Sequence, residues 1–184
     1  EHLRDWCEAR GRAPRQDEQA GLAQAQGQAI AAAQAQPGVQ LVLADTTAVM
    51  VAAYSEQYFG DDSLWPQALA QHASCGLTLL MGLDLPWVDD GLCRDSPEAR
   101  KTTDAILRRR LDAAGVRYQT VHGHGERRAA QALRAIGAAM GRDLVAPDPY
   151  WAQGRGRMDC GKCGDPDCEH RLFRDLIAQH DRSG

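Results

Sequence analysis

The sequence predicts an α/β fold in which helices flank a parallel sheet, and two observations support this prediction. Apolar or alternating runs of strand length occupy residues 39–45, 76–82 and 116–121. Segments whose apolar residues recur at helical spacing separate these runs. Strands that alternate with helices along a chain are typical of parallel sheets. We therefore expect one α/β domain over residues 1–141 and a small tail over residues 142–184.

The N-terminal part is expected to be helical up to the first strand. Residues 1–10 place apolar side chains on one helical face, and residues 16–36 carry a narrow apolar stripe that ends at Pro37-Gly38. That stripe consists of Leu22, Ala25, Ala29, Ile30 and Ala33.

The run 39–45 is apolar at nearly every position, which predicts a strand buried on both faces with Asp45 at its carboxyl end. An acid there can hold Mg²⁺ against nucleotide phosphates, because hard cations prefer oxygen ligands. Alternatively, Asp45 caps the helix that follows, since Asp and Thr are favoured N-cap residues.

Helices are expected next over residues 48–59 and 64–73, followed by the strand 76–82. Ser96 as N-cap and Pro97 at the first helical position predict a helix to about residue 114. Its apolar side is Ile106, Leu107 and Leu111, and residues 108–110 are interpreted as a solvated face. The run 116–121 leads through a glycine turn at 122–127 into a helix over 128–140.

Composition narrows the class of protein. The chain has 184 residues, 43% hydrophobic and 25% charged, as expected for a globular domain. A net charge of −4 argues against a nucleic-acid or anionic-membrane binder that works by bulk charge. We find neither a signal pattern nor an apolar run of about 20 residues, and we expect a cytoplasmic protein of open oligomeric state. The chain begins at Glu1, and part of the protein is expected to lie upstream.

A cysteine cluster marks the tail. Its spacing is C-x2-C-x4-C-x-H, with Cys160, Cys163, Cys168 and His170 as the candidate ligands. Four soft or borderline ligands so close together, with glycines between them, predict a structural zinc site. An iron–sulfur cluster, or free thiols on a flexible tail, are the alternatives.

Several strings together resemble the ribosylnicotinamide kinase domain of the bacterial NAD biosynthesis regulator and related P-loop (AAA-type) ATPase and kinase domains. The resemblance covers about residues 1–141. It rests on Glu1 to Arg4, Asp45-Thr46-Thr47, the segment 54–60, the segment 85–94 with Arg100, and the turn 123–127. It implies a P-loop nucleoside-kinase-like fold, with ATP and Mg²⁺ as cofactors and a mobile lid bearing arginines.

The resemblance also implies roles for individual residues. Glu1 would accept the proton of the attacking hydroxyl, with Arg4 near the substrate, and Asp45 would support Mg²⁺. In the lid at 83–100, Arg94 and Arg100 would face the transferring phosphoryl group, unless they form surface ion pairs. The turn 122–127 would flank adenine, with Gly123, Gly125 and Arg127 as nucleotide-binding residues.

The same lid offers contacts to a nucleoside. Trp87 would stack on the nicotinamide or another ring, and Asp89 or Asp90 would bind ribose hydroxyls or a cationic pyridinium. The alternative for Trp87 is packing on the core.

One departure separates the chain from the family. The phosphate loop G-x-x-x-x-G-K-[ST] does not occur in the 184 residues. The sequence therefore leaves two functions open. The first is ATP-dependent phosphoryl transfer to a hydroxyl of a small nucleoside. The second is a non-catalytic nucleotide-binding regulatory module that uses the zinc tail to dock a partner protein.

Overall fold

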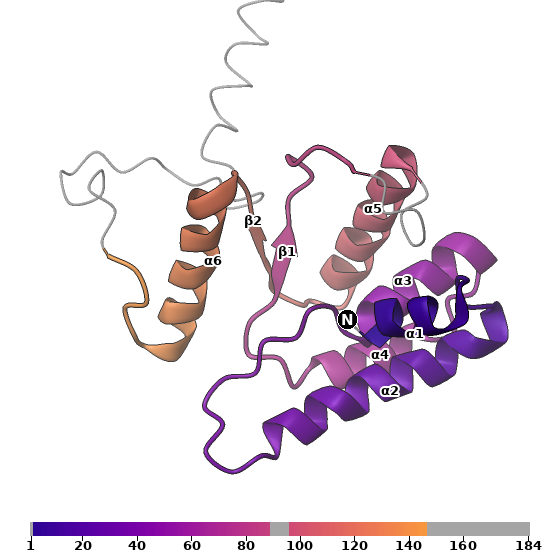
Figure 1. Cartoon of the computed structure of the whole chain (residues 1–184), viewed down its shortest axis with the longest axis horizontal. Coiled ribbons are helices and arrows are strands. Elements are labelled where there is room, and N and C mark those ends of the chain that lie inside the picture. Colours follow the sequence, from indigo (N-terminus) through magenta and orange to yellow (C-terminus); the bar gives the residue numbers. More distant parts are fainter. Residues whose placement is uncertain (1, 89–95, 147–184) are drawn as a thin grey trace, which may run out of the picture. The chain divides into compact units, whose positions relative to one another are not determined.

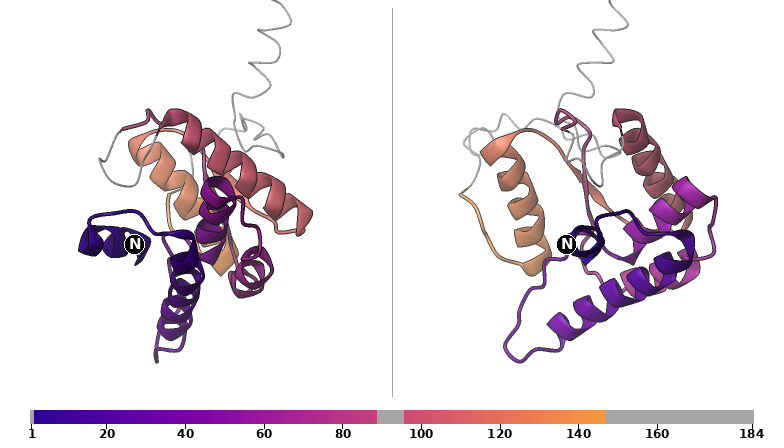
Figure 2. Two further views of the ribbon diagram at one scale, coloured as in Figure 1. Left: turned by 90° about the vertical axis from the view of Figure 1, so that its right-hand side faces the viewer. Right: turned by 45° about the vertical axis from the view of Figure 1, so that its right-hand side comes forward.

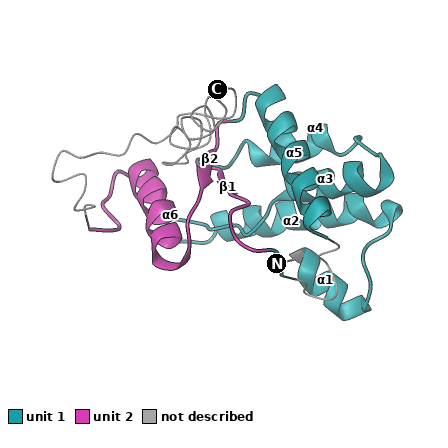
Figure 3. Cartoon of the chain, turned by 90° about the horizontal axis from the view of Figure 1, so that it is seen from above, with its two compact units in different colours: residues 1–76, 87–116 teal, residues 77–86, 117–184 magenta. Residues whose placement is uncertain are grey.

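The computed structural model describes residues 2–88 and 96–146, which fall into two compact units (Figure 3). Unit 1 is formed by residues up to 76 together with residues 87–116. Unit 2 contains residues 77–86 and the chain from residue 117 onward. Each unit is therefore built from segments that are separated in sequence.

Unit 1 is helical in the part that the structure describes. Its helices are α1 (His2–Arg10), α2 (Gln16–Gln34), α3 (Ala48–Phe59), α4 (Trp65–His72) and α5 (Pro97–Ala113). Helix α3 contacts α2, α4 and α5, and α1 contacts α2 (Figure 1, Figure 2). The hydrophobic core of unit 1 is accordingly centred on α3.

The sequence of α3 explains its central position. Its buried residues lie on several sides of the helix, as expected for a helix with neighbours all round. Thr47 is the N-cap, and its Oγ1 accepts a hydrogen bond from the Val49 amide at 3.3 Å. Gly60 ends the helix in the left-handed conformation at φ 65°, which costs glycine little. The predicted helix over 48–59 is confirmed, and Thr47 rather than Asp45 caps it.

Helix α5 begins as the sequence predicts. The Ser96 side chain accepts a hydrogen bond from the Ala99 amide at 3.0 Å, and Pro97 occupies the first helical position. The three predicted apolar residues, Ile106, Leu107 and Leu111, are buried.

The interpretation of residues 108–110 as a solvated face holds for Arg109, whose side chain is 59% exposed, but not for Arg108 and Arg110, which are half-buried. Arg110 Nε donates to Glu56 on α3 at 2.9 Å, and Arg109 also pairs with Glu56. Arg108 pairs along α5 with Asp104 at 2.8 Å. Spacing along a helix shows which side chains share a face, but it does not reveal an acid more than 50 residues away on another helix.

The prediction of a doubly buried strand at 39–45 is also wrong. The structure has no strand in this segment, and Val39, Leu41 and Leu43 are 41%, 45% and 72% exposed. The apolar stripe on α2 is likewise shifted. The buried residues there are Gln19, Leu22, Ala23 and Gln26, whereas Ala29 is exposed. Two buried glutamines thus replace the expected alanines, and one of them, Gln26, donates to the Thr46 carbonyl at the entry to α3.

The described residues of unit 2, 77–86 and 117–146, contain a parallel strand pair and one helix. Strand β1 (Leu79–Met81) pairs with β2 (Gln119–Val121), so that Leu79 lies opposite Gln119, and α6 (Gly125–Met140) contacts β2. The predicted strands are confirmed in shorter form and with parallel pairing. β1 is half-buried or exposed rather than buried, and α6 begins three residues earlier than predicted.

Gly137 in α6 is packed closely against the chain that follows the helix. A Cβ atom there would lie 2.4 Å from the Arg142 carbonyl oxygen, so the backbone after the helix would have to shift. We expect Gly137→Ala to lower the free energy of unfolding by about 1–3 kcal/mol. Gly21→Ala in α2, where no atom lies within 4 Å, should be neutral or stabilise by up to about 1 kcal/mol. Urea denaturation checks both, and equal effects would contradict the packing argument.

In the part of the chain that the structure covers, no helix has the length and apolar character required to span a bilayer.

Candidate functional site

The carboxyl ends of the two parallel strands carry a connected polar cluster. Asp84 follows β1, and its carboxylate accepts hydrogen bonds from the Gly123 amide, which follows β2, and from Arg128 Nη1 at 2.8 Å. Ligands of open parallel sheets bind outside this edge. The cluster therefore occupies the part of unit 2 where a ligand is expected.

Arg128 holds the cluster together from the first turns of α6. Its guanidinium also donates to the Gly82 carbonyl at 3.1 Å and to the Gly123 carbonyl at 3.2 Å. Its side chain is only 14% exposed. One planar cation thus fixes the loop after β1 against the turn after β2, which suits the fork-like donor geometry of arginine.

His122 and Gly82 complete this arrangement. The His122 amide donates to Gln131 Oε1 at 2.7 Å, and its Nδ1 lies 3.7 Å from Asp84 Oδ1. A Cβ on Gly82 would lie 2.4 Å from that ring nitrogen, so the close approach needs glycine.

The Asp84 carboxylate is ionised in this environment. Partial burial by itself would raise its pKa, but hydrogen bonds from Arg128 and the Gly123 amide outweigh burial and leave the pKa below its usual value. The charge on Asp84 is therefore neutralised within the cluster.

A second feature, in unit 1, is the turn that enters α3. Thr46 has φ 68°, the only positive φ among non-glycine residues of the described chain. Gln26 on α2 donates to the Thr46 carbonyl at 3.1 Å, and the Thr47 hydroxyl lies 3.1 Å from His72 Nδ1. Burial lowers the pKa of His72, which keeps its ring neutral near pH 7. Asp45 is exposed immediately before this turn.

Comparison with known families decides the class. Residues 1–128 match the family described as AAA domain, which is more than half of the chain. The chain belongs to the AAA domain family. No curated protein and no solved structure matches it. The family is one of P-loop nucleotide-binding domains, and its members are commonly ATPases or kinases. This supports the P-loop part of the predicted resemblance.

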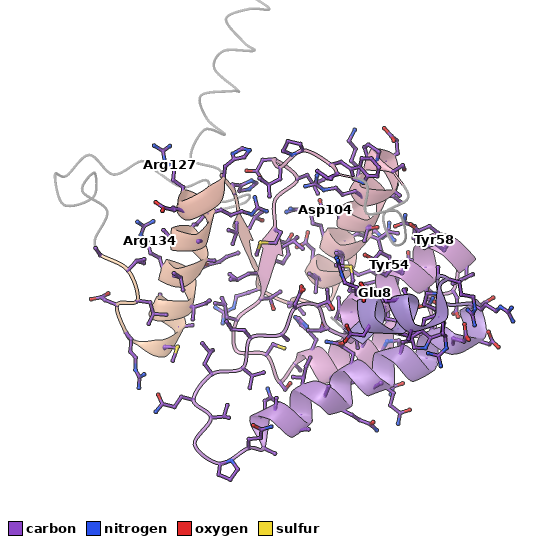
Figure 4. The ribbon with its side chains drawn as sticks, in the orientation of Figure 1. Glu8, Tyr54, Tyr58, Asp104, Arg127 and Arg134 are labelled. Carbon is purple, nitrogen blue, oxygen red and sulfur yellow. The ribbon has the colours of Figure 1, made fainter. Side chains whose placement is uncertain are left out.

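The AAA domain has its predicted nucleotide-binding residues at the start of α6. Gly123 is part of the polar cluster with φ 91°, and Gly125 begins the helix with φ 52°. Arg127 is exposed, and Figure 4 shows Arg127 and Arg134 pointing away from β2. The neighbouring Arg128, which the sequence did not single out, makes the contacts to the strand ends.

The predicted residues of unit 1 lie on four separate segments. Arg4 is exposed on α1, Asp45 precedes α3, Trp87 is half-buried near the start of the predicted lid, and Arg100 is half-buried in the first turn of α5. Arg100 thus lies in the helix that Ser96 and Pro97 predict.

Other predicted site residues lie outside the part that the structure describes. They are Glu1, Asp89, Asp90, Arg94 and the four candidate zinc ligands Cys160, Cys163, Cys168 and His170. Within residues 2–88 and 96–146, no three histidine, cysteine or acidic side chains gather in a way that could hold a metal ion.

Sequence reasoning missed Asp84, Arg128 and Gln26. Asp84 and Arg128 are 44 positions apart, and Gln26 lies in an alanine- and glutamine-rich helix. The one local signal was the Gly82-x-Asp84 string directly after a strand run, because polar residues at that edge are favoured site residues.

Proposed function

We propose that this AAA domain transfers the γ-phosphoryl group of ATP to a hydroxyl of a small nucleoside of the ribosylnicotinamide type. The observation that carries this proposal is the Asp84–Arg128–Gly123 cluster. It ties the first residues of the proposed lid to the proposed adenine-flanking turn, at the carboxyl edge of parallel strands. This link would couple closure of the lid to the nucleotide-binding turn. Lid closure of this kind completes the catalytic site in many enzymes.

The proposed chemistry assigns a task to each group. Glu1 takes the proton of the acceptor hydroxyl, and Arg4 lies on the substrate side. Arg94 and Arg100 neutralise the charge on the γ-phosphoryl oxygens as it passes to the acceptor and ADP leaves. Such transfer asks the protein chiefly for positioning and positive charge.

Asp45 is proposed to help hold Mg²⁺, which would neutralise charge on the nucleotide when bound. The local donor set fits a hard cation. Asp45 is exposed, and a carboxylate oxygen is the kind of ligand that a hard cation prefers. The further proposed contacts are Trp87 stacked on the base, Asp89 and Asp90 on the ribose or a pyridinium, and Gly123, Gly125 and Arg127 along the adenine.

The tail is proposed to hold a structural zinc ion through Cys160, Cys163, Cys168 and His170. The support is their ligand type and spacing, which close a tetrahedral site. A closed site of this kind stabilises or docks, and it leaves no open position for catalysis.

The full-length protein, assayed with ATP, Mg²⁺ and a panel of nucleosides, should phosphorylate a nucleoside that carries a pyridinium ring. We expect Asp45→Ala and Arg100→Ala each to lower kcat by about 100-fold or more. Asp112→Ala, which removes an exposed carboxylate of α5, serves as the matched control with parental kcat. Parental activity of Asp45→Ala would refute its role. Nucleotide binding without transfer to any nucleoside would instead favour the regulatory module.

A further inference from the structure

We infer that Gln26 and His72 are positioning residues that hold the 45–47 turn in the conformation in which Asp45 meets the metal–nucleotide complex. This inference rests on the proposed function of Asp45. It adds to that function two residues, on α2 and α4, that no sequence pattern marks as part of the site.

The turn stores conformational strain. Thr46 adopts φ 68°, where a β-branched side chain is crowded by its own backbone. Such a residue is strained and persists only when its surroundings hold it, which is common at functional sites. The conformation of Thr46 sets the direction in which the chain leaves Asp45 and enters α3.

Two buried side chains supply the required hold. Gln26 is 7% exposed and donates to the Thr46 carbonyl at 3.1 Å, so it fixes the strained peptide itself. His72 is also 7% exposed, and its Nδ1 lies 3.1 Å from Thr47 Oγ1. Thr47 in turn caps α3 through the Val49 amide. Nδ1 of a neutral imidazole can accept a hydrogen bond from the Thr47 hydroxyl. Oγ1 of Thr47 still accepts a hydrogen bond from the Val49 amide, so the three groups satisfy one another.

The Gln71 side chain of α4 reaches α2 beside Gln26. A Cβ on Gly27, next to Gln26, would lie 2.4 Å from Oε1 of Gln71, next to His72. The turn is therefore held by one buried side chain from α2 and one from α4, two helices that both contact α3.

The test measures metal affinity and local opening separately. Mn²⁺ serves as the probe, with its binding to the ATP-loaded full-length protein followed by electron paramagnetic resonance. Hydrogen exchange of the amides of residues 46–50 reports opening of the turn. We expect Gln26→Met, which keeps side-chain volume but removes the donor, to weaken Mn²⁺ binding by about 10-fold or more and to speed that exchange.

Rescue separates positioning from general stability. Glycine adopts positive φ without strain, so Thr46→Gly added to Gln26→Met should restore most of the Mn²⁺ affinity. His72→Asn, whose amide can replace Nδ1 towards Thr47, should stay near the parent, whereas His72→Leu should resemble Gln26→Met. Parental affinity in Gln26→Met, or a loss that Thr46→Gly does not restore, would overturn the inference.

Asp45→Asn separates a failure of the positioning role of Gln26 from a failure of the metal role of Asp45. If it weakens Mn²⁺ binding while Gln26→Met does not, only the positioning role falls. If Asp45→Asn binds Mn²⁺ like the parent, the proposed metal role of Asp45 falls and the positioning role falls with it. Faster exchange in Gln26→Met would then assign Gln26 a purely structural role.

Discussion

Glu56→Ala is expected to lower the free energy of unfolding by about 2–3 kcal/mol, measured by urea denaturation. The Glu56 carboxylate accepts from Trp65 Nε1 at 2.6 Å and Arg110 Nε at 2.9 Å, and it also pairs with Arg109. Its loss leaves the indole N–H of a 3% exposed tryptophan without its acceptor. Arg110 also lies over the Trp65 ring, 5.4 Å from the centroid, so one removal weakens links among three helices.

Asp104→Ala is the matched control, because its side chain is 16% exposed like that of Glu56. Asp104 pairs only along its own helix with Arg108, an interaction worth about 0.2–0.5 kcal/mol. A loss in Asp104→Ala as large as in Glu56→Ala would contradict the proposed importance of the interhelical links.

The same carboxylate should make stability depend on acid. Burial favours the neutral form of Glu56, but the arginines and the indole outweigh it and hold the pKa below its usual 4.5. The unfolded chain therefore takes up a proton at higher pH than the folded one. The contribution of Glu56 is complete above about pH 4.5 and is lost as the pH falls through the folded pKa. Glu56→Gln should lack this part of the acid dependence.

Arg128→Met is expected to reduce kcat/KM for phosphoryl transfer by about 10- to 100-fold, mostly through a raised KM for ATP. The guanidinium joins the Gly82 and Gly123 carbonyls to the Asp84 carboxylate, and methionine keeps the apolar stem without these bonds. The loop after β1 and the turn after β2 would then move independently.

Arg134→Met is the control for that experiment, since Arg134 is an exposed arginine of the same helix that points away from β2 (Figure 4). Steady-state kinetics with varied ATP should leave Arg134→Met at parental values. Equal kinetics in the Arg128 and Arg134 variants would contradict a role of the polar cluster in nucleotide binding.

Local sequence signals correctly predicted the helix ends that are fixed by capping residues. Ser96-Pro97 placed the start of α5, and Gly60 ended α3, because capping depends on residues close in sequence. The run 39–45 failed, since apolar content does not show whether a neighbour is present to cover it.

The candidate site was predictable to the same limited extent. The glycine turn at 123–125 carries a local signature, and the structure places it at the strand edge. Asp84 with Arg128, and Gln26 with Thr46, are pairs that only the folded chain brings together. Tertiary hydrogen bonds of this kind leave no trace in the spacing of one sequence.

The parallel pairing of β1 with β2 has a consequence for the order of folding. Leu79 and Gln119 are register partners 40 positions apart, and α5 of unit 1 lies between them in the chain. Closing so long a segment costs chain entropy before any strand hydrogen bond repays it. The contacts among α2, α3 and α4 join neighbouring elements and do not carry this cost. We therefore expect the contacts among α2, α3 and α4 to form first and the edge that carries Asp84 and Gly123 to assemble later.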